Sequence, residues 1–155
     1  MNKVLVSTGK DDWETPFEFF QELDKEFHFT LDPCCTEETA KCKKFYTEQE
    51  DGLLQSWEGE TVFCNPPYSR ELQDQFVKKC YEEGQKINTT VVALLPARTD
   101  TKRFHQYILG KSEIRFLQGR IRFVGAKDPA PFPSMVVVFR EVKKDGTELY
   151  AGTIE

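Results

Sequence analysis

The chain has 155 residues, of which 39% are hydrophobic, and a formal net charge of −5 at pH 7. This length and composition suit one folded domain with an apolar core and leave little room for a separate target-recognition domain. No run of about 18 apolar residues occurs, and the residues after Met1 lack the apolar core of a signal peptide. We therefore expect a single domain over residues 1–155, located in the cytoplasm.

The five cysteines do not form the pattern of a metal site or of a disulfide framework. Their number is odd, none forms a Cys-x-x-Cys pair, and only two His are present. A zinc site would need four ligands at recognisable spacing. We expect buried, reduced thiols and no bound metal.

Charge is distributed unevenly along the chain. The net negative charge argues weakly against a protein that grips nucleic acid by bulk electrostatics. Between residues 98 and 127, however, two acidic residues stand against eight basic ones: Arg98, Lys102, Arg103, Lys111, Arg115, Arg120, Arg122 and Lys127. This segment fits either a local face that handles and releases nucleic acid, or ordinary solvated charge.

The first sixty residues predict one helix followed by short pieces. Thr15 can cap a helix, Pro16 suits its first position, and four apolar residues then recur at helical spacing: Phe17, Phe20, Leu23 and Phe27. Residues 29–31 predict a short strand that ends at Asp32-Pro33. Residues 34–60 lack strong periodicity, so we expect loops, with a short strand at Phe45-Tyr46.

The rest of the chain alternates strands and helices. Residues 61–64 predict a strand, and Ser69 can cap a helix that ends at Gly84, with an apolar face of Leu72, Phe76, Val77 and Cys80. Residues 90–95 predict a strand buried on both sides. A second helix carries Phe104, Tyr107 and Ile108 and is closed by Gly110. Strands are expected over 113–117, 121–124 and 135–141, with a final hairpin around residues 144–147.

This order predicts an α/β domain with a mostly parallel sheet, antiparallel edge strands and flanking helices. Ligands of such sheets bind beyond the carboxyl ends of the strands. Asp32, Asn65 and Pro96 each follow a predicted strand. One crevice is therefore expected to collect all three.

Asn65-Pro66-Pro67-Tyr68, directly after an apolar strand, has the residue types needed to methylate an aromatic amine. The lone pair of such an amine is conjugated into the ring, so two acceptors are needed to localise it: the Asn65 carboxamide oxygen and the Pro66 carbonyl. The two prolines stiffen the loop and preorganise these acceptors. Tyr68 offers a ring for stacking a base rotated out of the duplex. A Pro-Pro turn that merely ends the strand is the structural alternative.

Four further polar residues are candidates for contact with the substrate. Arg98 and Asp100 follow a strand at the expected active-site end, where Arg98 can bind phosphate or a flipped base and Asp100 can alternatively cap the next helix. Arg120 and Arg122 occupy alternate positions of a predicted strand and would share one face. They either contact DNA or lie on an exposed sheet surface.

The chain resembles the phage-type DNA N-6-adenine methyltransferase family, a Dam-like group within the Rossmann-like methyltransferases. The likeness runs from Trp13 to Phe139 and is carried by these segments: residues 13–16, 31–34, 65–69, 95–101, 119–123 and 130–135. The Asn-Pro-Pro-Tyr motif alone is shared with methyltransferases that act on RNA or on protein glutamine. All of these segments together, in this order, are typical of a much narrower group of proteins than the motif alone.

The resemblance implies a Rossmann-like fold, S-adenosylmethionine as the cofactor and double-stranded DNA as the partner, in a phage or prophage setting. It implies cofactor contacts from Trp13, Thr15, Pro16, Asp32, Pro33, Cys34, Asp51 and Asn65. Catalysis would fall to Asn65, Pro66, Pro67 and Tyr68. DNA contacts would come from Tyr68, Ser69, Arg98, Asp100, Arg120 and Arg122. The sequence departs from the wider superfamily after Asp32, where Cys34-Cys35-Thr36 replaces a glycine-rich loop.

The expected function is therefore site-specific methylation of the N6 amino group of adenine in DNA. Two other functions fit part of the pattern. The same chemistry can act on an RNA base or a protein glutamine, which share an amide-like or aromatic amino nitrogen. A catalytically idle binding module would keep the pocket, although it has no chemical need for Asn65 or Tyr68.

Overall fold

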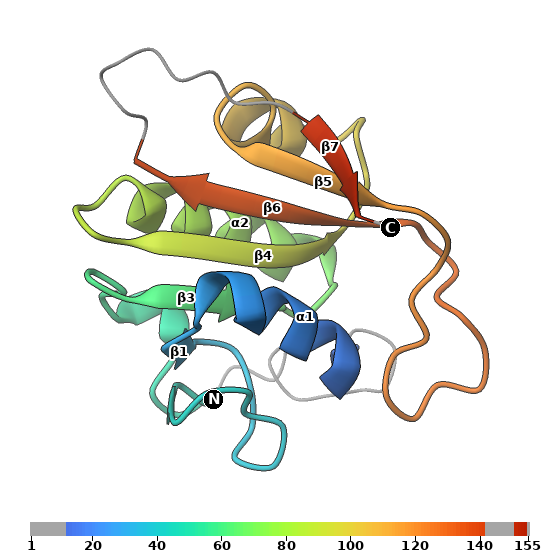
Figure 1. Ribbon diagram of the computed structural model, residues 1–155. Helices are drawn as coiled ribbons and strands as arrows, with labels where there is room; N and C mark the ends of the chain where they lie inside the picture. The colour runs from blue at the N-terminus through green and yellow to red at the C-terminus, as the bar shows by residue number, and fades with distance from the viewer. Residues whose placement is uncertain (1–11, 142–150, 155) are drawn as a thin grey trace.

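The computed structural model describes residues 12–141 and 151–154. Its strands form one seven-stranded sheet in the order β2-β1-β3-β4-β6-β5-β7 (Figure 1). The strands are β1 (Leu31–Asp32), β2 (Lys44–Phe45), β3 (Thr61–Cys64), β4 (Thr90–Pro96), β5 (Glu113–Leu117), β6 (Ser134–Arg140) and β7 (Ala151–Ile154). The predicted α/β class is confirmed, and the architecture is compatible with a Rossmann-like methyltransferase.

Only β6 runs against the other strands. It pairs antiparallel with β4, from Thr90↔Arg140 to Pro96↔Ser134, and antiparallel with β5 on its other side. The expectation of antiparallel strands at the sheet edge is therefore wrong, because β6 lies inside the sheet. Residues 134–139 are all buried, and the apolar run from Met135 to Phe139 needs cover on both faces.

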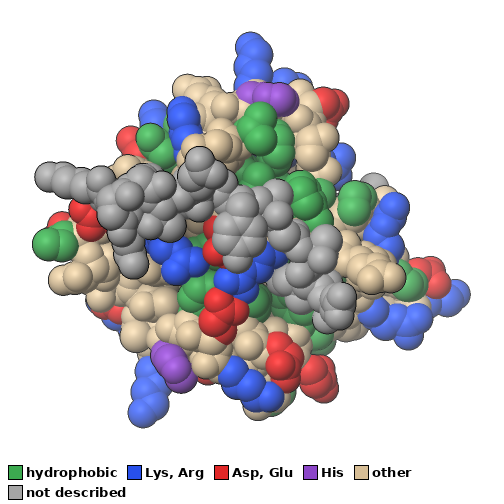
Figure 2. Space-filling view, turned by 45° about the horizontal axis from the view of Figure 1, so that its top comes forward, with side chains coloured by type: hydrophobic (Ala, Val, Ile, Leu, Met, Phe, Trp, Pro, Cys, Tyr) green, Lys and Arg blue, Asp and Glu red, His purple; other side chains and the backbone are tan. Residues whose placement is uncertain are grey.

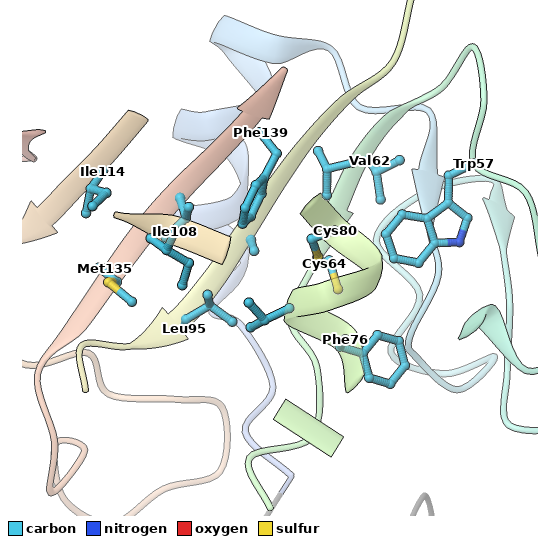
Figure 3. Packing of buried hydrophobic residues seen from close by; sticks show 14 of the residues in the cluster. Trp57, Val62, Cys64, Phe76, Cys80, Leu95, Ile108, Ile114, Met135 and Phe139 are labelled. Carbon is cyan, nitrogen blue, oxygen red and sulfur yellow. The ribbon is translucent and has the colours of Figure 1, made fainter. Parts of the chain in front are cut away.

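Two helices cover opposite faces of the sheet. Helix α1 (Phe17–Phe27) lies in front of the sheet in Figure 1 and α2 (Arg70–Gly84) lies behind it. Alternate residues of β4 divide between them, since Val92 and Leu94 belong to the cluster of α1, whereas Val91, Ala93 and Leu95 belong to that of α2. Figure 3 shows the α2 cluster, in which Phe76 and Cys80 of the helix pack with Cys64 and Leu95 of the strands.

The predicted starts of both helices need correction. Helix α1 begins at Phe17 with Pro16 in the N-cap position, so Thr15 is not the cap. The Thr15 hydroxyl instead accepts a hydrogen bond from the Asn65 side chain. Ser69 does occupy the N-cap of α2, but its side chain makes no capping bond. The first strand begins at Leu31 rather than Phe29.

Two predicted elements between β4 and β6 are not formed as expected. The helix at 104–108 is a short π-type turn, η3 (Phe104–Ile108), followed by Gly110 at a φ of 75°. Residues 121–124 are not a strand. Ile121 and Phe123 are buried and their neighbours exposed, which explains the alternation, but the segment has no strand partner and packs over the α1 face as a loop. The expected hairpin around residues 144–147 lies outside the described residues.

All five cysteines are free thiols, of which Cys64 and Cys80 are buried and the other three are half-buried. The expectation of buried thiols thus holds for two of them. Within residues 12–141 and 151–154, no helix is long and apolar enough to cross a membrane.

Gly84 provides a test of the contact between α2 and the sheet. A Cβ added there would lie 2.7 Å from the Phe139 Cβ and 3.1 Å from its carbonyl oxygen, and this backbone cannot give way easily. We expect Gly84→Ala to lower the free energy of unfolding by about 1–3 kcal/mol, despite the better helix propensity of Ala. Urea denaturation measures this. Gln85→Ala, at an exposed neighbour, should change it by less than about 0.5 kcal/mol.

Candidate active site

A cleft of about 1100 Å³ opens at the carboxyl ends of β1 and β3. Its lining residues come mainly from four segments, 12–15, 32–41, 47–54 and 63–67. Strands β1 and β3 are parallel neighbours, so the loops that follow them emerge at the same edge of the sheet. Asp32 and Asn65 meet in this cleft, as expected, whereas Pro96 does not line it.

The predicted cofactor residues are gathered here almost completely. Seven of the eight line the cleft: Trp13, Thr15, Asp32, Pro33, Cys34, Asp51 and Asn65. Pro16 does not line it, because it is the N-cap of α1 and its carbonyl accepts from the Phe20 N–H. The spatial grouping of these residues across fifty positions of sequence is what a ligand site requires.

Asp32 organises the loop that follows β1. Its two carboxylate oxygens accept hydrogen bonds from the backbone N–H groups of Cys34, at 3.3 Å, and Lys41, at 3.0 Å. The side chain is buried, and this burial raises its pKa to about 6, against the opposing effect of the hydrogen bonds. Asp32 therefore fixes both ends of loop 34–41, which forms one wall of the cleft.

Asp51 and Gly52 form the adjoining wall. Asp51 has a φ of 55°, and its side chain caps the short 3-10 turn η2 (Gly52–Leu54) by accepting from the Leu53 N–H at 3.0 Å. A Cβ at Gly52 would stand 2.1 Å from the Pro33 carbonyl oxygen, so only glycine permits this approach. Trp57, fully buried, donates its indole N–H to the Gly52 carbonyl. The walls after β1 and before β3 are thus packed directly together.

The Asn65 side chain is held by its amide nitrogen. That NH₂ group donates one hydrogen bond to the Trp13 carbonyl and another to the Thr15 hydroxyl, the latter at 3.0 Å. The carboxamide oxygen is buried and has no hydrogen-bond partner among the described residues. Buried acceptors without partners are rare in folded proteins and often mark functional positions. Asn65 therefore presents a free acceptor at the cleft.

The remaining motif residues lie behind and beside Asn65. Pro67 lines the cleft, and its carbonyl accepts from the Gln73 side chain at 3.1 Å, whereas Pro66 is buried and does not line the cleft. The Tyr68 hydroxyl donates to the Leu94 carbonyl at 3.2 Å, and burial raises the pKa of this phenol, which stays protonated.

The Tyr68 ring belongs to an aromatic cluster just outside the cleft. Its centroid lies 6.5 Å from that of Trp13, 6.2 Å from Phe123 and 5.3 Å from Phe132. Phe123 and Phe132 come from the segment between β5 and β6, residues 118–133. This segment therefore packs against both the motif and the N-terminal wall of the cleft.

The four predicted DNA-contact residues beyond the motif are all exposed and do not line the cleft. The Arg98 guanidinium contacts segment 118–133, since it lies 5.8 Å from the Phe132 ring centroid, and Arg120, which belongs to this segment, donates to the Ala130 carbonyl. Asp100 does not cap the following turn, because the Thr101 hydroxyl accepts from the Phe104 N–H there. Arg122 lies on the loop and not on a strand.

Basic residues do not form a single patch on the face seen in Figure 2, where Lys and Arg are spread among Asp and Glu. Ser69, the other candidate beside the motif, is half-buried, and its hydroxyl has no partner among the described residues.

The cleft also contains residues that motif reasoning missed. Lys41 forms an ion pair of 3.2 Å with Glu14 and so joins two of the cleft walls. Glu48 lines the cleft with one carboxylate oxygen buried and without a partner among the described residues. The lining is strongly acidic, with one lysine against these seven carboxylates: Asp12, Glu14, Asp32, Glu37, Glu38, Glu48 and Asp51. In the sequence, the excess of acidic over basic residues among the first sixty positions is the feature that could have indicated this acidic lining.

Comparison with known proteins identifies the family. The family model described as DNA N-6-adenine-methyltransferase (Dam) matches residues 3–153. The chain belongs to this family. Among curated proteins, it is 33% identical over 140 residues to the DNA N-6-adenine-methyltransferase of Haemophilus phage HP1 (strain HP1c1), a match that covers 85% of this chain and 80% of the phage protein. It is 32% identical to the DNA N-6-adenine-methyltransferase of Escherichia phage T1, covering 87% of this chain and 65% of that longer protein.

Membership of the DNA N-6-adenine-methyltransferase family confirms the resemblance inferred from the ordered motifs, and both relatives come from phages. A methyl-group donor follows from membership of a methyltransferase family. Within the described part of the chain, no group of three or more His, Cys, Asp or Glu side chains could hold a metal ion.

The pH dependence of stability tests the role of buried Asp32 in holding loop 34–41. Because the folded-state pKa is raised from 3.8 to about 6, the folded protein retains a proton that the unfolded chain releases between these values. Asp32 therefore favours folding below about pH 4, and this contribution is lost as pH rises through about 6. Relative to Asp32→Asn, the wild type should lose about 2–3 kcal/mol of unfolding free energy over this range.

Parallel urea denaturations of wild type and Asp32→Asn from pH 4 to pH 7 measure this difference. The variant supplies the matched background, since every other titrating group is common to both proteins. A stability difference that does not change with pH would contradict the raised pKa.

Proposed function

We propose that this protein is a site-specific DNA methyltransferase that moves a methyl group from S-adenosylmethionine to the N6 amino group of adenine. The observation that carries the proposal is the Asn65 carboxamide oxygen, which is buried at the cleft and has no partner among the described residues. It stands in the Asn-Pro-Pro-Tyr motif of a chain that belongs to the DNA N-6-adenine-methyltransferase family. A free acceptor is what a reacting amino group requires.

The cleft suits S-adenosylmethionine in size and charge. Its volume of about 1100 Å³ accommodates a nucleoside linked to an amino acid, and its carboxylates favour a cationic sulfonium. When bound, this cofactor supplies an electrophilic methyl group. Asp51 and Glu48 carry carboxylates suited to its hydroxyl and amino groups, and Trp13 offers an apolar ring. Loop 34–41, held by Asp32, would form one wall around it in place of the glycine-rich loop of the wider superfamily.

At the acceptor, two oxygens localise the lone pair of the adenine amino group. The Asn65 carboxamide oxygen accepts one N–H and the Pro66 carbonyl accepts the other. Because the loop contains two prolines and Gln73 holds the Pro67 carbonyl, these acceptors are fixed before the substrate arrives. The nitrogen becomes an acidic ammonium on methylation and releases its proton to solvent, so no side chain has to act as a base.

The DNA face adjoins the motif outside the cleft. Tyr68 provides an aromatic surface for an adenine rotated out of the duplex. Arg98, Arg120 and Arg122 are exposed residues whose guanidinium groups suit phosphate oxygens, and Ser69, beside the motif, has a buried hydroxyl without a partner among the described residues. Arg98 contacts segment 118–133, and Arg120 and Arg122 belong to it, so substrate contact and target reading fall to loops of one domain spanning residues 1–155.

Asn65→Ala tests the reaction and the active site together. We measure transfer of tritiated methyl groups from S-adenosylmethionine to unmethylated duplex DNA and identify the labelled nucleoside. Wild type should form N6-methyladenine, and Asn65→Ala should lower the rate by about a hundredfold or more, as expected when one preorganised polar contact of a transition state is removed. Gln85→Ala, an exposed amide away from the cleft, should retain wild-type activity.

The same assay with RNA or protein in place of DNA separates the competing functions. Label in an RNA base or in protein glutamine, with none in DNA, would assign the same reaction to a different substrate. Wild-type protein that binds no S-adenosylmethionine, measured by calorimetry, would leave only an idle binding module. Full activity of Asn65→Ala on DNA would overturn the role given to the carboxamide oxygen.

A further inference from the structure

We propose that the segment Trp13–Thr15 is a positioning element that orients the Asn65 amide for catalysis, with Thr15 as its positioning side chain. The inference rests on the proposed function and assigns Thr15 a role other than contact with the cofactor alone. Its basis is a set of hydrogen bonds that connects residues fifty positions apart in sequence.

The Trp13 carbonyl fixes which way the amide faces. A carboxamide presents two chemically different ends, an oxygen that accepts and an NH₂ group that donates. A backbone carbonyl can only accept, so the Asn65 end facing Trp13 must be the NH₂ group. The Thr15 hydroxyl receives the second N–H at 3.0 Å. With both protons engaged, the carboxamide oxygen is the end left for the substrate.

Thr15 is built for this contact rather than for its expected capping role. The residue is only 2% exposed, and α1 begins after Pro16 without a side-chain cap. A buried threonine hydroxyl needs a partner, and Asn65 provides it. Loss of this hydroxyl would leave one Asn65 proton without a partner in a buried site and weaken the preference for the productive orientation.

The segment is anchored independently on both sides. The Val124 N–H donates to the Glu14 carbonyl at 3.0 Å, and the Glu14 carboxylate pairs with Lys41 of the opposite wall. Trp13 and Thr15 also line the cleft, so a bound cofactor touches the same residues that hold Asn65. Occupation of the cleft and orientation of the catalytic amide are therefore linked through this segment.

Selective labelling of asparagine makes the orientation observable. The chain contains only three Asn, at positions 2, 65 and 88, so ¹⁵N-Asn protein gives three pairs of side-chain NH₂ signals. The pair that disappears in Asn65→Asp belongs to Asn65. In wild type, both Asn65 protons should exchange slowly with water, and S-adenosylhomocysteine should slow them further. In Thr15→Val, one proton should shift and exchange at least about tenfold faster, as expected for a lost hydrogen bond, and Thr15→Ser should restore it.

Kinetics supply the second readout. Thr15→Val should lower kcat for DNA methylation about tenfold, the effect of losing one neutral hydrogen bond. Its Kd for S-adenosylmethionine should stay within about threefold of wild type, and Thr15→Ser should recover kcat. Thr89→Val is the matched control, because Thr89 is equally buried and its hydroxyl accepts from Gly59 and donates to Ile87, next to the start of β4. It should lower thermal stability but leave the Asn65 signals and kcat unchanged.

The outcomes separate this inference from the proposed function. Unchanged Asn65 signals in Thr15→Val, or a loss of cofactor affinity equal to the loss of kcat, would overturn the positioning role and leave the reaction standing. A wild type that methylates no DNA would overturn the proposed function. The NMR comparison would still report in that case whether Thr15 holds the Asn65 amide.

Discussion

The hydrogen bonds of the Asn65 amide to Trp13 and Thr15 are the interaction on which the arrangement of the site depends. Asn65 follows a buried strand of the central sheet, whereas residues 13–15 precede α1. Their contact closes one side of the cleft and leaves the buried carboxamide oxygen without a partner among the described residues. Since α1 packs on the sheet through Phe20 and Leu23, the burial of an apolar helix face sets the position of this polar contact.

A second constraint on the shape of the cleft comes from the polar groups that are buried where its walls meet. The carboxylate oxygens of Asp32 accept hydrogen bonds from backbone N–H groups of loop 34–41. Gly52 allows the wall formed by Asp51 and Gly52 to approach the Pro33 carbonyl. These contacts replace the rigidity that a glycine-rich loop gains from its own tight turn. The cleft that these walls enclose is acidic, because seven carboxylates and one lysine line it, and such a lining repels anionic groups.

The sequence predicted elements whose pattern is local, and it failed where partners are distant. Strand β5 and the apolar face of α2 followed from periodicity alone. The Ile121–Val124 alternation imitated a strand because Ile121 and Phe123 bury their side chains in a loop that has no strand partner. Thr15 looked like a helix cap, since nothing near it in sequence indicates that its hydroxyl faces Asn65. Seven of the eight residues expected at the cofactor line one cleft, a grouping predicted by family motifs, which carry long-range information that periodicity lacks.

Segment 118–133 combines buried aromatic side chains with exposed basic ones. Phe123 and Phe132 belong to the core cluster beneath α1 and also approach the Tyr68 ring. Their burial stabilises the fold, whereas Arg98 and Arg120 lie at the outer surface of the same segment. Of these two arginines, Arg98 also contacts the ring of Phe132. Arg122 and Lys127 are exposed on this loop and lie outside that core, so they can change without cost to it.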